Sequence, residues 1–183
     1  MIFIHDTRDQ KGKHDNLEKW MSNNGHELIR EKMNVGDVML LGDGSICIDL
    51  KSLGLSEVYN NITHDHKRFR NECVRAMEAG VKLIILVEQE GIQSLEDVKT
   101  WHNPHFDRRR RNDEYIAFMI SRGLKAEDAM PRKQPVSSER LAGMMEAMSF
   151  RYGVEWQFCN PAAVGETVFS ILTAPYRKTQ RFE

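Results

Sequence analysis

The sequence of 183 residues is poor in cysteine and has no long apolar run. Its three cysteines, Cys47, Cys73 and Cys159, are widely spaced and form no C-x-x-C pair, which excludes a secreted disulfide framework. No uninterrupted apolar segment approaches the roughly 20 residues that cross a bilayer, and the N-terminus turns acidic at Asp6, too early for a signal peptide. We therefore expect a cytoplasmic protein with reduced, mostly buried thiols and no membrane partner.

A strong net charge is also lacking, because 26 Lys and Arg stand against 27 Asp and Glu. This balance excludes a histone-like, purely electrostatic binder of nucleic acid. The charges are unevenly spread, however: residues 99–140 carry ten basic and six acidic side chains, and residues 174–183 carry three and one. A polyanion could approach these two segments, while the acidic remainder could serve solvation or contain cation ligands.

Hydrophobic periodicity predicts a single α/β domain over residues 1–183, with a mixed central sheet flanked by helices. The Gly42-Asp43-Gly44 turn indicates a hairpin, and the run at 81–87 indicates a buried, central strand. Strands are expected at 2–5, 35–41, 45–51, 81–87 and 154–158. Helices are expected at 15–32, 56–79 with a break near Thr63, 113–122, 141–148 and 161–172.

Residues 99–140 interrupt this alternation and are interpreted as an inserted basic arm. The segment contains Asn103-Pro104, four consecutive arginines (Arg108, Arg109, Arg110 and Arg111), Pro131 and Pro135. The arginines are equally consistent with a solvated loop and with contact to DNA phosphates.

The hairpin carries the residues with the clearest chemistry. Strand side chains alternate between faces, so Asp49 and Lys51 are expected on one side of the sheet and Leu50 on the other. A tight turn would also bring Asp37 close to Asp49. Two adjacent carboxylates are tolerated when a hard divalent cation bridges them, and a lysine beside the cation can orient or help to deprotonate an attacking water. Taken singly, each residue could equally shape a turn or form a surface ion pair.

Several ordered segments, covering about residues 1–90, resemble the XPF-type nuclease domain of the PD-(D/E)XK superfamily, which has a restriction-endonuclease-like fold. They are Asp6-Thr7-Arg8-Asp9, Val35-Gly36-Asp37, Ile48-Asp49-Leu50-Lys51-Ser52, Arg68-Phe69-Arg70-Asn71-Glu72-Cys73 and Leu86-Val87-Glu88. Nothing resembles a tandem helix-hairpin-helix module, and Tyr152 to Cys159 is similar to a strand of small stand-alone nucleases from phages and prophages.

The resemblance implies a Mg²⁺- or Mn²⁺-dependent endonuclease for branched, flap or junction DNA that acts as a homodimer. The residues it assigns to the site share acidic or basic character. Asp37, Asp49 and the Leu50 carbonyl are expected to bind metal, Lys51 to position water, Asp6 to add a further acid, Arg68 to meet phosphate or brace the carboxylates, and Arg8 with Arg108, Arg109, Arg110 and Arg111 to bind substrate. The sequence departs from the family pattern at Asp9, Asp49-Leu50 and Glu72, where the family has Glu, Glu-Arg and Gln. Glu57 is a secondary acidic candidate.

Two alternatives remain open: a catalytically silent nuclease fold that binds DNA or protein, and a sequence-specific restriction-type enzyme. A zinc site at His64 and His66 or at His102 and His105 is disfavoured, because no cysteine pair lies nearby at ligand spacing. Trp101 is left open as a base-stacking residue.

Overall fold

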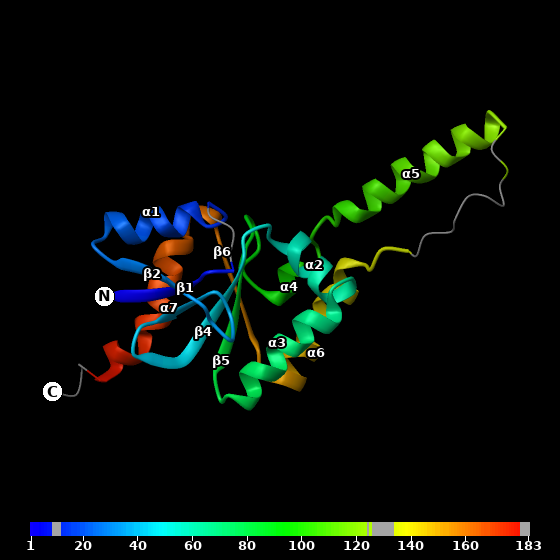
Figure 1. The fold of residues 1–183 in the computed structure, drawn as a ribbon. Helices are drawn as coiled ribbons and strands as arrows, with labels where there is room; N and C mark the ends of the chain where they lie inside the picture. Colours follow the sequence, from blue (N-terminus) through cyan, green and yellow to red (C-terminus); the bar gives the residue numbers. More distant parts are fainter. Residues whose placement is uncertain (9–11, 124, 126–133, 180–183) are drawn as a thin grey trace.

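The computed structural model describes residues 1–8, 12–123, 125 and 134–179. Within these ranges the chain forms a six-stranded mixed sheet covered by helices on both faces (Figure 1). The strands are β1 (Ile2–Asp6), β2 (Glu27–Glu31), β3 (Val38–Leu40), β4 (Asp43–Lys51), β5 (Lys82–Glu88) and β6 (Glu155–Cys159). The helices are α1 (Asp15–Asn23), α2 (Leu55–Thr63), α3 (His66–Glu78), α4 (Leu95–Val98), α5 (Pro104–Ser121), α6 (Ser138–Tyr152) and α7 (Val164–Thr179), with a 3₁₀ turn η2 (Pro161–Ala163).

The strand order is β2-β1-β3-β4-β5-β6, which confirms the predicted mixed α/β architecture. Strand β3 is antiparallel to both of its neighbours, β1 and β4, and the remaining pairs are parallel. Strand β5 lies between β4 and β6, and all of its residues after Lys82 are buried, as expected for an interior strand.

The sheet separates two apolar cores, and β4 contributes to both. Cys47 packs in the core under α2, α3 and α6, whereas Ile48 and Leu50 pack in the core under α1 and α7. Because alternate strand residues face opposite sides, Asp49 and Lys51 lie on the same face as Cys47. This confirms the predicted common face of Asp49 and Lys51 and turns both toward α3.

The predicted helix over 15–32 is wrong in its second half. Helix α1 ends at Asn23, and Gly25 with φ +70° lets the chain reverse into β2, which pairs in parallel with β1. Leu28 and Ile29 fit a helical period with Leu17, yet pairing with β1 and packing on the sheet determine their conformation.

Strand β3 is shorter than the predicted 35–41, because it begins only at Val38. Leu40 pairs with Asp43, so the hairpin turn contains only Leu41 and Gly42, with Gly42 at φ +87°. Asp43 therefore belongs to β4 rather than to the turn, and residues 35–37 form the bend that leads into the sheet.

Helix α5 begins nine residues before the expected position. Asn103 caps it by accepting a hydrogen bond from the His105 N–H, and Pro104 occupies the first turn. The four arginines therefore lie in a helix and not in a loop, while their expected contact with DNA phosphates stays a prediction.

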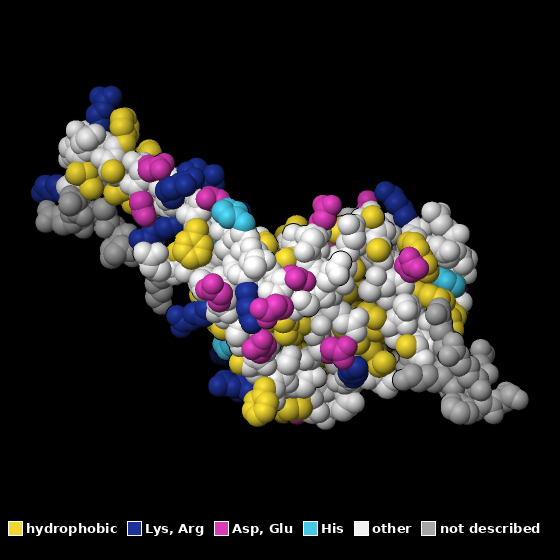
Figure 2. All heavy atoms as spheres, turned by 180° about the vertical axis from the view of Figure 1, so that it is seen from behind, with side chains coloured by type: hydrophobic (Ala, Val, Ile, Leu, Met, Phe, Trp, Pro, Cys, Tyr) yellow, Lys and Arg dark blue, Asp and Glu magenta, His cyan; other side chains and the backbone are white. Residues whose placement is uncertain are grey.

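The 18 residues of α5 include no buried one, and the helix projects away from the sheet (Figure 1). Basic, acidic and hydrophobic side chains are intermixed on this projection (Figure 2). Pro131, in the expected arm, and residues 180–183, in the C-terminal basic segment, lie outside the described residues. None of the described helices is both long and apolar enough to span a membrane.

Candidate active site

The end of β4 carries a buried ion pair. The exposed fractions of Asp49 and Lys51 are 3% and 4%, and Lys51 Nζ lies 2.7 Å from Asp49 Oδ1 and 2.6 Å from Oδ2. Burial alone would lower the pKa of Lys51, but the charges of Asp49 and Asp37 outweigh it and raise the pKa above its usual value. Lys51 is therefore an ammonium group that donates hydrogen bonds to Asp49 and neutralises its charge.

Asp37 is held against β4 by the close approach of two backbones. A Cβ atom on Gly36, which has φ +63°, would lie 2.5 Å from Cys47 Sγ and 2.9 Å from the Ile48 carbonyl oxygen, so only glycine fits. The Asp37 N–H donates to the Ile48 carbonyl at 2.7 Å, and Asp37 Oδ2 accepts from the Leu50 N–H at 2.8 Å. The Asp37 carboxylate thus meets the backbone of the residue that follows Asp49.

Leu50 takes part in the site through its backbone, since its side chain is buried on the opposite face of the sheet. Its N–H group donates to Asp37, as described above, which places Asp37 next to β4. Asp37 lies in the bend before β3 rather than on the expected strand, and its approach to the Asp49 carboxylate stays a prediction.

Glu72 of α3 brings a third carboxylate to this face of the sheet. Its Oε1 accepts from the Gly36 N–H at 3.1 Å. Burial, followed by the negative charge of Asp49, raises the pKa of Glu72 above its ordinary value, while Lys51 and the Gly36 hydrogen bond oppose the rise. Sequence reasoning noted Glu72 only as a departure from the family glutamine. The available signal was its position one helical turn after Arg68, which puts both residues on one face of α3.

The charges of Asp37, Asp49 and Glu72 act together on the neighbouring Cys47 thiol. The pKa of the Cys47 thiol is raised by burial and by the negative charges of Asp37, Asp49 and Glu72. Negative charge is therefore concentrated beside the Asp49–Lys51 pair, and the site is electrostatically suited to a cation.

Asp6 is used differently from the prediction that it joins the acidic set. Its buried carboxylate accepts hydrogen bonds from Arg8 Nε at 2.7 Å and from the Arg8 N–H at 3.1 Å. Burial would raise the pKa of Asp6, but the Arg8 hydrogen bonds and charge hold it below its usual value. Asp6 joins the site through its backbone, since its N–H donates to the Asp37 carbonyl at 2.8 Å.

Arg8 lies at the edge of the carboxylate cluster. The hydrogen bond to Asp6 raises the pKa of Arg8, burial opposes this, and the charges of Glu72 and Asp37 raise it further. A second hydrogen bond runs from Arg8 Nη2 to the Met33 carbonyl at 2.7 Å. Because 53% of the Arg8 side chain is exposed, this fixed guanidinium can meet a substrate from solvent. Asp9, the next residue of the motif, lies outside the described part of the chain.

Arg68 and Glu57 lie beside the cluster. Arg68 is exposed on α3, and its Nη2 donates to Asn61 Oδ1 at 2.9 Å rather than to one of the carboxylates described above. Glu57 Oε2 accepts from the Leu53 N–H at 3.2 Å, and Lys13 Nζ lies 3.5 Å from Glu57 Oε1. The negative charge of Glu57 contributes to the raised pKa of Lys51.

The arm arginines lie on α5, apart from the carboxylate cluster. Arg109 pairs with Asp113 at 2.8 Å, and Arg110 lies 3.7 Å from Asp107. Arg108 and Arg109 line a pocket at the base of the arm, while Arg110 and Arg111 are exposed. The structure thus separates the four predicted substrate-binding arginines of the arm from the carboxylate cluster, whereas Arg8, the fifth, lies at the edge of that cluster.

Comparisons with known proteins identify the fold. No family model and no curated protein matches the chain. Among solved structures, XPF from Aeropyrum pernix superposes with a TM-score of 0.60 at 15% identity, covering 100% of this chain and 68% of that one. XPF from the same organism in complex with DNA gives a TM-score of 0.58 at 16% identity, with 97% and 66% covered. The chain therefore has an XPF-like α/β fold and corresponds to about two thirds of each of those chains.

Proposed function

We propose that this protein is a DNA endonuclease of the PD-(D/E)XK type, which hydrolyses phosphodiester bonds with the help of a divalent metal. The observation that carries the proposal is the buried Asp49–Lys51 pair, with Asp37 fixed beside it through the Leu50 N–H. DNA as the substrate is supported by the XPF–DNA complex among the structures of the same fold.

The donor set suits Mg²⁺ or Mn²⁺, because these cations prefer carboxylate and carbonyl oxygens. Both oxygens of the buried Asp49 carboxylate are within 2.7 Å of Lys51 Nζ, so a metal would share this carboxylate with Lys51 or displace the ammonium from it. Asp37, Asp49 and the Leu50 carbonyl would hold the metal, with Glu72 adding negative charge. When bound, the metal would lower the pKa of a water molecule and stabilise charge on the scissile phosphate.

The residues of the chain would divide the remaining work. Lys51, as an ammonium, would donate a hydrogen bond to the attacking water or to the phosphate after its contact with Asp49 is broken. Arg8, fixed by Asp6, and Arg68, on the helix beside the cluster, would bind phosphate oxygens. The arginines Arg108 to Arg111 would contact the DNA backbone at a distance from the scissile bond.

Branched DNA is the proposed substrate class, and the proposed active form is a homodimer, because symmetric cutting of a junction requires two sites. The sheet and the arm provide two separated contact regions, which suits a substrate with two duplex arms. A mass of one chain in sedimentation equilibrium, with and without junction DNA, would count against the dimer.

The experiment is an incubation of purified protein with linear duplex, flap, fork and four-way junction DNA, with Mn²⁺ or with EDTA. We expect Mn²⁺-dependent cleavage of branched DNA, and a loss of at least about 100-fold in Asp49→Asn with DNA binding retained. Asp43→Asn, at the other end of the same strand, is the matched control and should cleave normally. Absence of cleavage of every DNA in Mn²⁺ would refute the proposal.

A silent DNA-binding module is the second candidate, and one observation favours it. Lys51 already contacts both oxygens of Asp49, and the described residues contain no group of three His, Cys, Asp or Glu side chains arranged to hold a metal. This candidate predicts tight binding to DNA without cleavage in any metal.

Equal cleavage of one junction built in several unrelated sequences would exclude the restriction-type alternative.

A further inference from the structure

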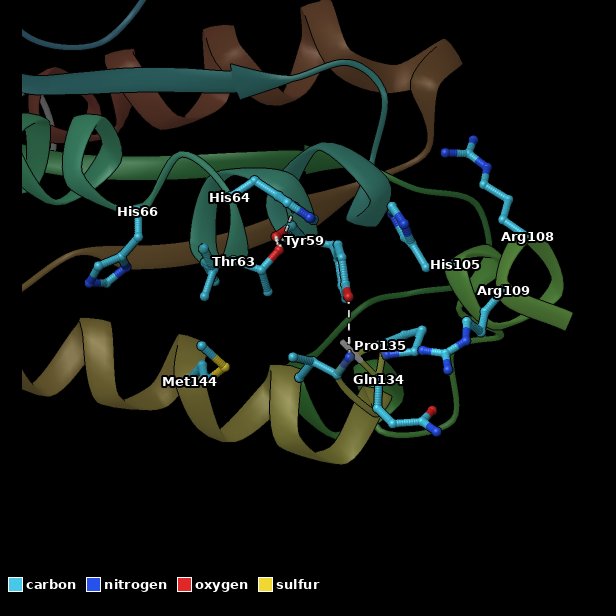
Figure 3. Close-up of a pocket in the computed structure, with 12 residues that line it drawn as sticks. Tyr59, Thr63, His64, His66, His105, Arg108, Arg109, Gln134, Pro135 and Met144 are labelled. Atoms are coloured by element: carbon cyan, nitrogen blue, oxygen red, sulfur yellow. Dashed lines mark hydrogen bonds between the residues drawn. The ribbon is translucent and has the colours of Figure 1, made fainter. Parts of the chain in front are cut away.

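The described residues form a pocket of about 830 Å³ at the base of the arm (Figure 3). It lies between α2, the beginnings of α3 and α5, and the segment that leads into α6. Its size is at the upper end of the range typical of small-molecule sites. Neither the carboxylate cluster nor the proposed cleavage chemistry uses it.

The lining combines an apolar floor with a cationic rim. Ile62, Val136 and Met144 form the apolar part, and Arg108 and Arg109 lie at the rim (Figure 3). The polar lining also includes Thr63, His64, His66, His105 and Gln134, and no carboxylate belongs to the described lining residues. Arg109 is paired with Asp113, so the pocket suits a ligand that combines an apolar surface with a negative charge placed against Arg108.

Ring surfaces in the pocket are fixed by protein contacts. The rings of Tyr59 and His105 stack at 4.1 Å with an angle of 20°, and Tyr59 Oη accepts a hydrogen bond from the Val136 N–H at 3.1 Å. Tyr59 is buried, whereas His105 is half-buried and His64 is exposed, with 6.4 Å between the two imidazole centroids. Tyr59 therefore supports the imidazole of His105, and the two histidines offer flat surfaces to a ligand.

The pocket is connected to the candidate active site by a polar path. His64 also lines a second, shallower pocket of about 430 Å³ together with Arg68, Lys67 and Asn71. Arg68 binds Asn61, whose side chain donates to the Glu57 carbonyl at 2.7 Å. The second pocket, whose lining also includes Asp65, thus places the cationic side chains of Lys67 and Arg68 on α3 between the carboxylate cluster and the arm.

We propose that this pocket binds one unpaired nucleotide of a DNA strand, with the base against the apolar floor and the imidazole of His105, and the phosphate against Arg108, which lies beside His105 (Figure 3). Only an unpaired base can leave its stack and enter a pocket, and aromatic stacking with cationic backbone contacts is the usual way in which proteins hold single strands. The inference rests on the proposed function for the source of the nucleotide. It adds that the strand is unpaired where it meets Arg108 at the base of the arm.

The first test measures binding without cleavage. Full-length protein in EDTA is titrated against a fluorescent flap DNA and a blunt duplex of the same length. Arg108→Ala and His105→Ala should each weaken flap binding about tenfold, the expected size for losing one stacking or phosphate contact, and leave duplex binding within about twofold. Arg151→Ala, an exposed arginine of α6 outside the pocket, is the matched control and should change neither. Equal losses on flap and duplex would overturn the proposal, because the arm would then only read duplex phosphates.

The second test locates the base directly. An oligonucleotide with 5-iodouracil at each unpaired flap position in turn is irradiated with the wild-type protein in EDTA, and cross-linked peptides are identified by mass spectrometry. One flap position should cross-link to Tyr59, His64, His105 or Met144. Cross-links only outside the pocket would overturn the inference, and competition by free dAMP at equal affinity would show that it takes a mononucleotide instead. If the cross-link forms but the wild-type protein cleaves no DNA in Mn²⁺, the result counts against the proposed nuclease activity and not against the pocket as a nucleotide site.

Discussion

Replacement of Lys51 by Met tests whether the cluster at the end of β4 is a compensated set of buried charges. The substitution keeps the apolar length of the side chain and removes only the ammonium, so Asp49, which is 3% exposed, loses its neutralising partner. Removing one member of a buried pair costs about 3–5 kcal/mol, because the remaining charge stays desolvated. For a chain of this size that corresponds to a fall in Tm of about 6–20 °C.

The chain offers a matched control for this substitution. Lys82 Nζ lies 2.6 Å from Glu155 Oε2, the same separation as in the buried pair, but its side chain is 52% exposed and that of Glu155 is 41% exposed. Lys82→Met should cost no more than about 1 kcal/mol. Urea unfolding in EDTA, followed by circular dichroism, compares the two variants. A cost for Lys51→Met within about 1 kcal/mol of that for Lys82→Met would refute the reasoning.

The same variant tests the proposed metal site. Lys51 and a divalent cation compete for the Asp49 carboxylate, so Lys51→Met should bind Mn²⁺ more tightly than the wild type even though it loses catalysis. A cation at 100 times its Kd stabilises the folded state by about 2.7 kcal/mol. Mn²⁺ should therefore raise the Tm of Lys51→Met more than that of the wild type, and no metal-dependent shift in either protein would refute the site.

Three further outcomes follow from the geometry. Gly36→Ala should lower the free energy of unfolding by about 1–3 kcal/mol in thermal unfolding, because the new Cβ would meet Cys47 Sγ and residue 36 has a positive φ. Adding Cys47→Ser to this variant should not restore stability, because the strain of the positive φ remains. Glu72→Gln should be more stable than the wild type at pH 8 in EDTA, because the raised pKa of Glu72 means that its ionisation costs stability, and the difference should close as the pH falls below the ordinary value of 4.5. Asp6→Asn should lower the free energy of unfolding by about 1.5–3 kcal/mol at pH 7, measured in urea, because the lowered pKa of Asp6 reflects stabilising hydrogen bonds from Arg8. This difference should disappear as the pH falls through the lowered pKa of Asp6, and a difference that stays constant with pH would contradict the reasoning.

The sequence predicted the elements whose own pattern decides their structure. The apolar run of β5 and the common face of Asp49 and Lys51 follow from local periodicity, and the structure confirms both. Strand β2 was missed because Leu28 and Ile29 also fit a helix, and only pairing with β1, which no local pattern contains, makes them a strand.

Other features depended on contacts between distant segments. Glu72 joins the cluster because α3 packs over β4 and the Gly36 N–H lies within reach, 36 residues earlier in the chain. Asp6 was expected among the acids, but its carboxylate accepts hydrogen bonds from the neighbouring Arg8, and this pairing is visible only in the structure.

The early start of α5 could have been predicted from the sequence, since Asn103-Pro104 is a typical helix beginning.

The length of α5 sets a physical scale for any DNA that lies along it. An 18-residue helix rises about 27 Å, and a duplex advances 3.4 Å per base pair, so this helix would run beside about eight base pairs. Because α5 projects from one side of the sheet, DNA contacts along it would lie on only one side of the proposed cleavage position. A nuclease of the proposed kind could then distinguish the two sides of a branch without contacting the bases.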